Sequence, residues 1–385
     1  MNILFLTERE AVPKMGGSFR ITYTLSRGLE KRGHNCFQLC GNDLFSYSTI
    51  EKNILGNHID IIISNLVDKE YKFATLPMVF EISRKTGSKV FACLHAMPGE
   101  ELIGNTVRNG LYRIFRGEKL IENLKFMILG LLPRKPLRLL FSNRLKKRYR
   151  ILYDNSDKMV VLSDRFYDDI ASLGKITIDD KCVVVHNALS FNSFLSEDKI
   201  PLKNKEVLIL SRMNERSKRL SRALRIWKKV NEEGNHNDWR LTIIGDGKDL
   251  YYYKRLAKRL RLKNLSFEGR KENEISYYER SAIFMMTSAY EGWGITLTEA
   301  QQMGVVPIAF DSYSSLHDII EDGKNGITVN NNDFEEYVEK LLWLMDHEED
   351  RCGMAREAIL SSRCFSLEVI LDRWENLFTL VQGTS

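Results

Sequence analysis

The chain has 385 residues, 43% apolar and 28% charged, which is enough apolar material for two folded domains and excludes a generally disordered protein. Its net charge is a mild +6. The six cysteines form no CxxC pair, so we expect them to be reduced residues of a cytosolic protein. Residues 2–10 lack the pattern of a secretory signal, and the longest apolar run, 126–132, is too short to span a bilayer.

The first half of the chain alternates strand-like apolar runs with helical patterns. A run at 2–7 is followed by Gly16 and Gly17 and then by helical spacing over 19–32. Further strand-like runs follow at 36–39, 59–64, 89–94, 158–162 and 182–185. This order predicts a parallel sheet, beyond whose carboxyl ends ligands bind. The glycine pair lies at such an end, although a simple tight turn would need the same residues.

His95 directly follows the strand-like run 89–94 and precedes a Pro-Gly loop. A histidine at the carboxyl end of a strand is well placed to meet a substrate, and its pKa near neutrality suits proton or phosphate handling. The alternative is a histidine with a purely structural role. We expect a functional one because of its position.

Residues 101–150 interrupt the alternation. Between 108 and 150 there are thirteen Lys or Arg and only two Glu, interspersed with apolar residues. Such a segment is typical of a helix on an anionic membrane surface. The alternative is a pair of helices packed on the domain with a solvated basic face. Nucleic acid is not expected as a partner, because no nucleic-acid-binding module is present.

The polar stretch at 190–205 is typical of a linker between domains, and a second series of predicted strands and helices follows it. The strand-like runs are 206–211, 239–245, 265–268, 282–286, 305–309 and 327–329, and we expect a loop and a helix after each but the last. The first run leads into a loop that carries Arg212 and Lys218, two cations suited to a diphosphate. An exposed basic helix face is the alternative. Gly245-Asp246-Gly247 reads as a structural turn.

The most informative stretch is 287–304, with Glu291, Gly292, Gly294 and Glu299. An apolar strand precedes it, and helical spacing begins after Gly294, so the glycines lie on a strand-to-helix turn. Glycines let the backbone approach a ligand, and the first N–H groups of the helix favour an anion such as a diphosphate. The alternative is a capped surface helix with two solvated glutamates.

Together these motifs resemble the retaining glycosyltransferases of family 4. The resemblance covers nearly the whole chain and depends most on Glu291-Gly-Trp-Gly-Ile-Thr-Leu-Thr-Glu299, in which seven residues separate the two glutamates. It implies the α/β fold called GT-B, with two facing Rossmann-like doubly wound parallel-sheet domains. The expected divisions are 1–190 for the acceptor side, 191–364 for the donor nucleotide sugar, and 365–385 for a helix that returns to the first domain.

The resemblance also implies roles for individual residues. Arg212 and Lys218 would neutralise the donor diphosphate, with help from backbone N–H groups. Glu291 would hold the donor sugar, Glu299 the ribose, and His95 would lie near the sugar and the acceptor. The remaining residues expected to line the nucleotide site are Gly16, Gly17, Arg270 with Lys271 beside it, Gly292, Gly294, Ile295 and Thr296. No metal or other cofactor is expected, because no DxD motif stands at a strand edge.

The implied reaction transfers a hexosyl residue, with retention, from a nucleotide-diphosphate sugar to a lipid-linked or glycan acceptor at the inner face of the cell membrane. Residues 310–315 resemble bacterial enzymes of surface polysaccharide and lipopolysaccharide synthesis, which favours a UDP-hexose. The alternatives are a GDP-mannose-dependent mannosyltransferase, a transferase with a soluble acceptor, a sugar-nucleotide epimerase and an inactive nucleotide-binding scaffold. A nicotinamide dehydrogenase is disfavoured because GxGxxG is missing.

Overall fold

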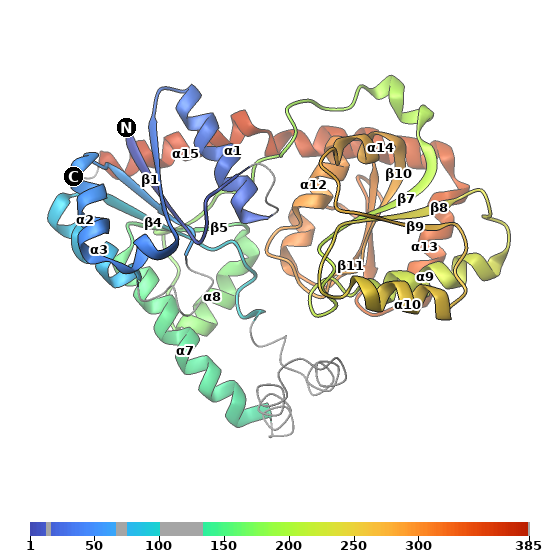
Figure 1. Cartoon of the computed structure of the whole chain (residues 1–385), viewed down its shortest axis with the longest axis horizontal. Coiled ribbons are helices and arrows are strands. Elements are labelled where there is room, and N and C mark those ends of the chain that lie inside the picture. Colours follow the sequence, from blue (N-terminus) through green and yellow to red (C-terminus); the bar gives the residue numbers. More distant parts are fainter. Residues whose placement is uncertain (13–16, 67–74, 101–133, 384–385) are drawn as a thin grey trace. The chain divides into compact units, whose positions relative to one another are not determined.

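A computed structural model describes residues 1–12, 17–66, 75–100 and 134–383 of the chain. The chain forms two compact units, shown in Figure 1. Unit 1 consists of Met1–His186 and Leu371–Ser385, and unit 2 consists of Asn187–Ile370. Each unit contains a six-stranded sheet whose neighbouring strands are parallel, so the predicted pair of parallel-sheet domains is confirmed.

Unit 1 has the strand order β2-β1-β3-β4-β5-β6. Its strands read as unbroken apolar runs because helices cover both faces of a parallel sheet, and Ile61, Ile62 and Ile63 are accordingly at most 1% exposed. The strands are β1 (Asn2–Thr7), β2 (Asn35–Cys40), β3 (Ile61–Ser64), β4 (Lys89–Cys93), β5 (Lys158–Val161) and β6 (Cys182–Val184). The helices are α1 (Ser18–Lys31), α2 (Tyr47–Gly56), α3 (Thr75–Thr86), α7 (Arg134–Asn155) and α8 (Tyr167–Gly174).

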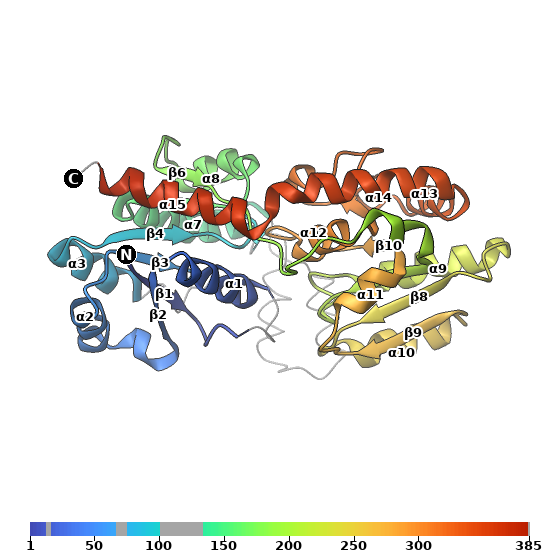
Figure 2. The same ribbon diagram turned by 90° about the horizontal axis from the view of Figure 1, so that it is seen from above.

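The C-terminal helix α15 (Leu367–Gln382) begins in unit 2 and ends in unit 1. It lies over β4 (Figure 2), where Phe91 stacks on Trp374 and Phe378 with ring centroids 6.2 and 5.7 Å apart. Arg32 and His34, which follow α1, bind the Glu375 carboxylate at 2.6 and 2.9 Å. The expected return of the last helix to the first domain is therefore confirmed.

Unit 2 has the strand order β12-β11-β10-β7-β8-β9. Its strands are β7 (Asn204–Leu210), β8 (Arg240–Ile244), β9 (Leu265–Gly269), β10 (Ser281–Met286), β11 (Val306–Asp311) and β12 (Ile327–Asn330). Its helices are α9 (Leu220–Glu233), α10 (Leu250–Arg259), α11 (Ile275–Arg280), α12 (Ile295–Gln302), α13 (Phe334–Asp346) and α14 (Glu348–Ser362). α9 packs beside α10 and α13, and α12 packs beside α14.

Three features of unit 2 differ from the sequence reading or go beyond it. β11 leads into a short 3-10 helix, Ser314–Asp318, so the expected helix after every strand but the last is wrong here. α14 was not foreseen. The polar stretch 190–205, predicted to be a linker, packs on unit 2, where the Leu195 N–H donates to the Gln302 carbonyl and the Gln302 side chain donates to the Phe191 carbonyl.

Most of the basic segment 108–150 lies outside the described residues. Its last part belongs to α7, where Leu145, Tyr149 and Leu152 are at most 5% exposed, while Lys147 and Arg150 are exposed. This part of the helix therefore packs on unit 1, beside α8, with a basic outer face. None of the helices in the described ranges is long and apolar enough to cross a membrane.

Candidate active site

The loop between β7 and α9 carries both predicted cations. Arg212 is exposed, whereas the Lys218 side chain is only 17% exposed and its ammonium forms an ion pair with the Glu291 carboxylate. The Thr287 hydroxyl donates to the Lys218 carbonyl at 3.2 Å, and the Ala289 N–H donates to the Ser217 carbonyl at 2.7 Å. Two stretches that are 73 residues apart in the chain are thereby joined at the carboxyl edge of the sheet.

The Gly245-Asp246-Gly247 turn after β8 contacts this loop and holds it in place. The turn therefore has the structural role that the sequence predicted. Gly245 has φ 131°, and a Cβ there would lie 1.9 Å from the Ser211 carbonyl oxygen, so only glycine allows this approach. The Met213 N–H donates to the Asp246 carbonyl at 2.8 Å. The buried Asp249 carboxylate accepts the Glu215 N–H at 2.6 Å. The backbone between Arg212 and Lys218 is therefore fixed from the neighbouring strand.

The turn that bears Glu291 lies between β10 and α12, as predicted. The Ser288 hydroxyl donates to the Glu291 carboxylate at 2.6 Å. Gly294 is the N-cap of α12 with φ 97°, and a Cβ there would lie 2.9 Å from the Tyr313 hydroxyl. The first N–H groups of α12, those of Ile295 and Thr296, are in the position that favours an anion.

Residues after β11 hold the Glu291 turn from the other side. The Ser312 hydroxyl donates to the Ser288 carbonyl at 2.8 Å, and the Ser315 hydroxyl donates to the Gly292 carbonyl at 3.1 Å. Burial and then the nearby Glu291 carboxylate raise the pKa of Tyr313 well above its ordinary value, so its hydroxyl stays protonated. Both serines lie in the turn and 3-10 helix that follow β11.

Glu299 lies in a different environment from Glu291. It is 0% exposed, on the second turn of α12, and accepts a hydrogen bond of 3.0 Å from the Tyr278 hydroxyl of α11. The Glu291 side chain is 14% exposed. Glu291 is therefore partly exposed on the turn, whereas Glu299 lies in the interior, and the different roles predicted for them stay predictions.

The remaining predicted residues fall at strand ends. Arg270 is exposed and directly follows β9, where the Gly269 carbonyl accepts the Gly245 N–H at 2.9 Å. In unit 1, Gly17 has φ 70° and is the N-cap of α1, and Gly16 lies outside the described residues. His95 follows β4, and its Nε2 is 2.9 Å from the Asn65 side-chain oxygen. The Asn65 amide in turn donates to the Thr22 hydroxyl at 2.7 Å.

Three residues that contact predicted site residues were not predicted from the sequence: Asn65, Tyr278 and Ser288. Asp249 and Ser312, which hold the backbone of the two loops, were not predicted either. Asn65 and Ser288 could have been predicted in the same way as His95, because each follows a buried strand at its carboxyl end. Tyr278 and Ser312 carry no comparable signal, because their partners are distant in the chain. No group of three or more His, Cys, Asp or Glu that could hold a metal ion occurs among the described residues.

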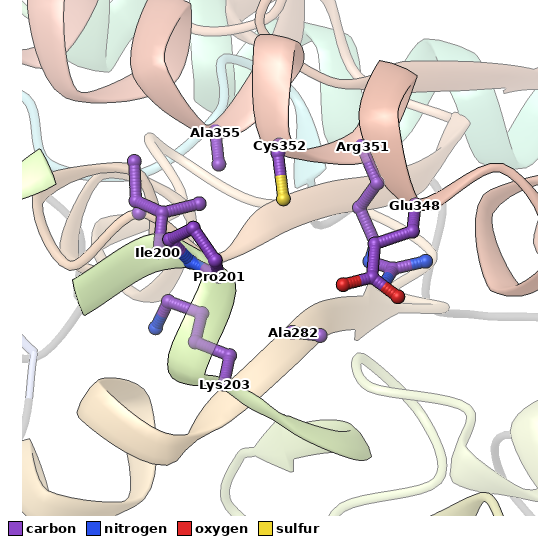
Figure 3. Close-up of a pocket in the computed structure, with 9 residues that line it drawn as sticks. Ile200, Pro201, Lys203, Ala282, Glu348, Arg351, Cys352 and Ala355 are labelled. Carbon is purple, nitrogen blue, oxygen red and sulfur yellow. The ribbon is translucent and has the colours of Figure 1, made fainter. Parts of the chain in front are cut away.

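A separate, small pocket lies in unit 2 at the opposite end of β10 (Figure 3). α14 contributes Glu348, Arg351 and Cys352 to its lining. Lys203 also lines it and donates to the carbonyls of Tyr278 and Glu279 at 2.8 and 2.9 Å. Burial lowers the pKa of Lys203 to about 7. Because this pocket is remote from the carboxyl ends of the strands, we do not assign the donor to it.

Comparison with known proteins gives a consistent picture. The family model described as "Glycosyl transferases group 1" matches residues 192–360. The amylovoran biosynthesis glycosyltransferase AmsD of Erwinia amylovora is 30% identical over 241 residues, which are 62% of this chain and 66% of that protein. The poly(ribitol-phosphate) alpha-N-acetylglucosaminyltransferase of Staphylococcus aureus is 31% identical over 131 residues, 32% of this chain and 26% of that protein.

The chain is also similar in fold to the crystal structure of Anabaena HepE in complex with UDP and glucose. The TM-score is 0.71 at 14% identity, over 98% of this chain and 99% of that one. At this identity the likeness concerns the fold alone. It extends over both units, whereas the family model matches unit 2 only.

Proposed function

The chain belongs to the group 1 glycosyltransferases, also called family 4, and from this premise we propose that it moves a hexosyl residue from a UDP-hexose to a glycan or lipid-linked acceptor of a bacterial surface polysaccharide. The observation that carries the proposal is the contact between Lys218 and Glu291 at the carboxyl edge of the unit 2 sheet. It joins a cation suited to phosphate with a carboxylate suited to sugar hydroxyls.

The leaving group of such a reaction is a nucleoside diphosphate, on which negative charge grows as the anomeric C–O bond breaks. Preorganised cations and N–H groups stabilise that charge. Arg212 offers a planar guanidinium for bidentate contact with phosphate, Lys218 offers a point charge, and the start of α12 offers backbone N–H groups. We assign the diphosphate to these groups and propose that no metal ion is needed.

Binding of the diphosphate would draw the Lys218 ammonium away from Glu291. The Glu291 carboxylate, still held by Ser288, would then be available to the hydroxyls of the donor sugar. Glu299 is assigned to the ribose, with its carboxylate oriented by Tyr278, and the backbone at Arg270 is assigned to the base. The roles of Gly17 and His95 in unit 1 stay predictions.

The similar proteins support the proposed donor and acceptor. HepE was crystallised with UDP and glucose, which supports a UDP-hexose rather than GDP-mannose. The names of AmsD and of the S. aureus transferase support an acceptor in a surface glycan. The thirteen cations between 108 and 150 support an attachment to the inner face of the cell membrane through anionic lipids.

A donor screen tests the proposal. Purified protein is incubated with UDP-glucose, UDP-galactose, UDP-N-acetylglucosamine and GDP-mannose, and both thermal protection and release of the nucleoside diphosphate are measured. We expect one UDP-sugar to protect and to be hydrolysed slowly, with the same rate in EDTA. A preference for GDP-mannose would reject the donor assignment, a strict need for added Mn²⁺ would reject the metal-independent mechanism, and no protection by any donor would favour an inactive scaffold.

A further inference from the structure

All the charged residues on the outward half of α10 are basic. The helix and the turn after it expose six cations, which we call the α10 basic face: Lys254, Arg255, Lys258, Arg259, Arg261 and Lys263. Tyr253 and Leu256, on the inward half, are at most 2% exposed and fix the helix on unit 2. The only acidic residue between 248 and 264 is Asp249, which is 1% exposed and serves the loop after β7. The face therefore has no acidic residue of its own.

The neighbouring helix α9 shows the usual arrangement of surface charges. Its Lys228 pairs with Glu232, and its Lys229 pairs with Glu335 of α13. In contrast, no ion pair within the described ranges involves a residue of the α10 basic face. α9 and α10 pack side by side (Figure 1), so the difference arises within one surface of unit 2.

The arrangement of the α10 basic face opposes the stability of the helix. Lys254 and Lys258, like Arg255 and Arg259, are four residues apart, and like charges at this spacing repel one another. A face that served only solubility would keep some of the compensating carboxylates that α9 has. The concentration of one sign of charge is instead suited to an anionic partner.

An aromatic side chain lies at the N-terminal end of the same face. Tyr251 is 70% exposed, and by helical spacing it is aligned with the cations three, four, seven and eight residues later. The Arg255 guanidinium is 5.8 Å from the centre of its ring. An exposed tyrosine surrounded by Lys and Arg on one helix face is typical of segments at the interface between lipid and water.

We propose that the α10 basic face docks unit 2 on a bilayer that contains anionic phospholipids. Residues 254 to 259 extend over about 8 Å at the rise of a helix, and Arg261 and Lys263 follow in the turn after it, so more than one lipid headgroup can contact the face at once. The cations bind headgroup phosphates, and Tyr251 enters the interfacial layer. This contact is separate from the one proposed for 108–150, which belongs to unit 1, and it does not depend on the transfer reaction.

Co-sedimentation of the full chain with vesicles tests the proposal. Vesicles of phosphatidylcholine with about 30% phosphatidylglycerol are compared with pure phosphatidylcholine, at about 50 mM and about 500 mM NaCl. The variant is K258Q/R259Q, and the matched control is K228Q/K229Q, which removes two cations that carboxylates already neutralise. Circular dichroism and the rate of donor hydrolysis check that both variants remain folded and active.

We expect K258Q/R259Q to bind the anionic vesicles about tenfold more weakly at low salt, with the control unchanged and with little binding to neutral vesicles. Equal binding of K258Q/R259Q and the unmodified protein would overturn the proposal, as would no binding of the unmodified protein. A loss of binding to soluble polyphosphate, with vesicle binding retained, would assign the face to a free polyanion instead. If no donor were hydrolysed, the proposed function would be rejected, but the vesicle-binding result for the α10 basic face would still hold.

Discussion

The carboxyl ends of the two sheets carry different kinds of polar groups. In unit 2, the Lys218 ammonium and the Glu291 carboxylate meet, and Ser288 and Ser312 hold the turn around them. In unit 1, the corresponding edge carries His95, whose ring bonds the neutral amide of Asn65. The comparison indicates that an ion pair is held between loops in unit 2, whereas the contact described for His95 in unit 1 is with a neutral amide.

This difference has a physical basis in how the loops are held. A cation and a carboxylate that are partly withdrawn from water need close partners, because an uncompensated charge there is costly. Unit 2 supplies them from three successive strand ends. We therefore expect substitutions at the unit 2 edge to affect the transfer rate most.

The largest effect is expected for Lys218→Ala. Loss of a cation that contacts the diphosphate should lower kcat/KM by about 10³-fold, or about 4 kcal/mol, because charge stabilisation in the transition state is lost. Steady-state kinetics with the donor found in the screen give the value. Lys228→Ala, which removes a cation paired with Glu232, is the matched control. If kcat/KM of Lys218→Ala stayed within threefold of the unmodified value, Lys218 would not contact the diphosphate, and the contrast between the two sheet edges would have no functional meaning.

The next effect tests whether the loop after β7 must be fixed. Gly245→Ala places a Cβ 1.9 Å from the Ser211 carbonyl at φ 131°, so we expect a loss of about 3 kcal/mol in the free energy of unfolding. Gly234→Ala is the control, since its φ is 75° but nothing lies within 4 Å, and it should cost about 1 kcal/mol. Denaturant titration measures both. Equal losses would show that the close approach is not what requires glycine.

A pH dependence is expected in unit 1. Burial, followed by Arg373, lowers the pKa of His186 from 6.5 to about 4. The unfolded chain therefore binds the proton first, and stability that is complete above pH 6.5 is lost as the pH falls from 6.5 to 4. The loss should be about 1 to 2 kcal/mol, after allowance for partial exposure. His186→Gln should flatten this part of the stability profile, and an unchanged profile would contradict the assignment.

The smallest effect concerns the orientation of Glu299. Tyr278→Phe removes the hydroxyl that donates to its carboxylate, and we expect KM for the donor to rise about fivefold, about 1 kcal/mol, with kcat nearly unchanged. Tyr337→Phe removes an equally buried hydroxyl, which donates to the Ile308 carbonyl at 2.7 Å, and should reduce stability without a change in KM. If both variants showed the same rise in KM, Tyr278 would have only a structural role and would not orient Glu299.

Much of this protein could be read from the sequence because its signals are local. Strands buried on both faces appear as unbroken apolar runs, as at Ile61–Ser64 and Ser281–Met286, and glycines mark the strand-to-helix turns. The spacing of Glu291 and Glu299 depends on a single turn and helix. These features sufficed to predict two parallel-sheet units and to place Arg212, Lys218 and both glutamates at strand ends or on the helix that follows.

Only the tertiary structure reveals the contacts between segments that are distant in the chain. No local pattern shows that Lys218 meets Glu291, that Tyr278 bonds Glu299, or that Gly245 supports the loop of Arg212. Likewise, only the folded chain shows that Lys229 of α9 meets Glu335 of α13. The reason is that strand order brings these segments together, and that order is a property of the assembled sheet rather than of any one stretch.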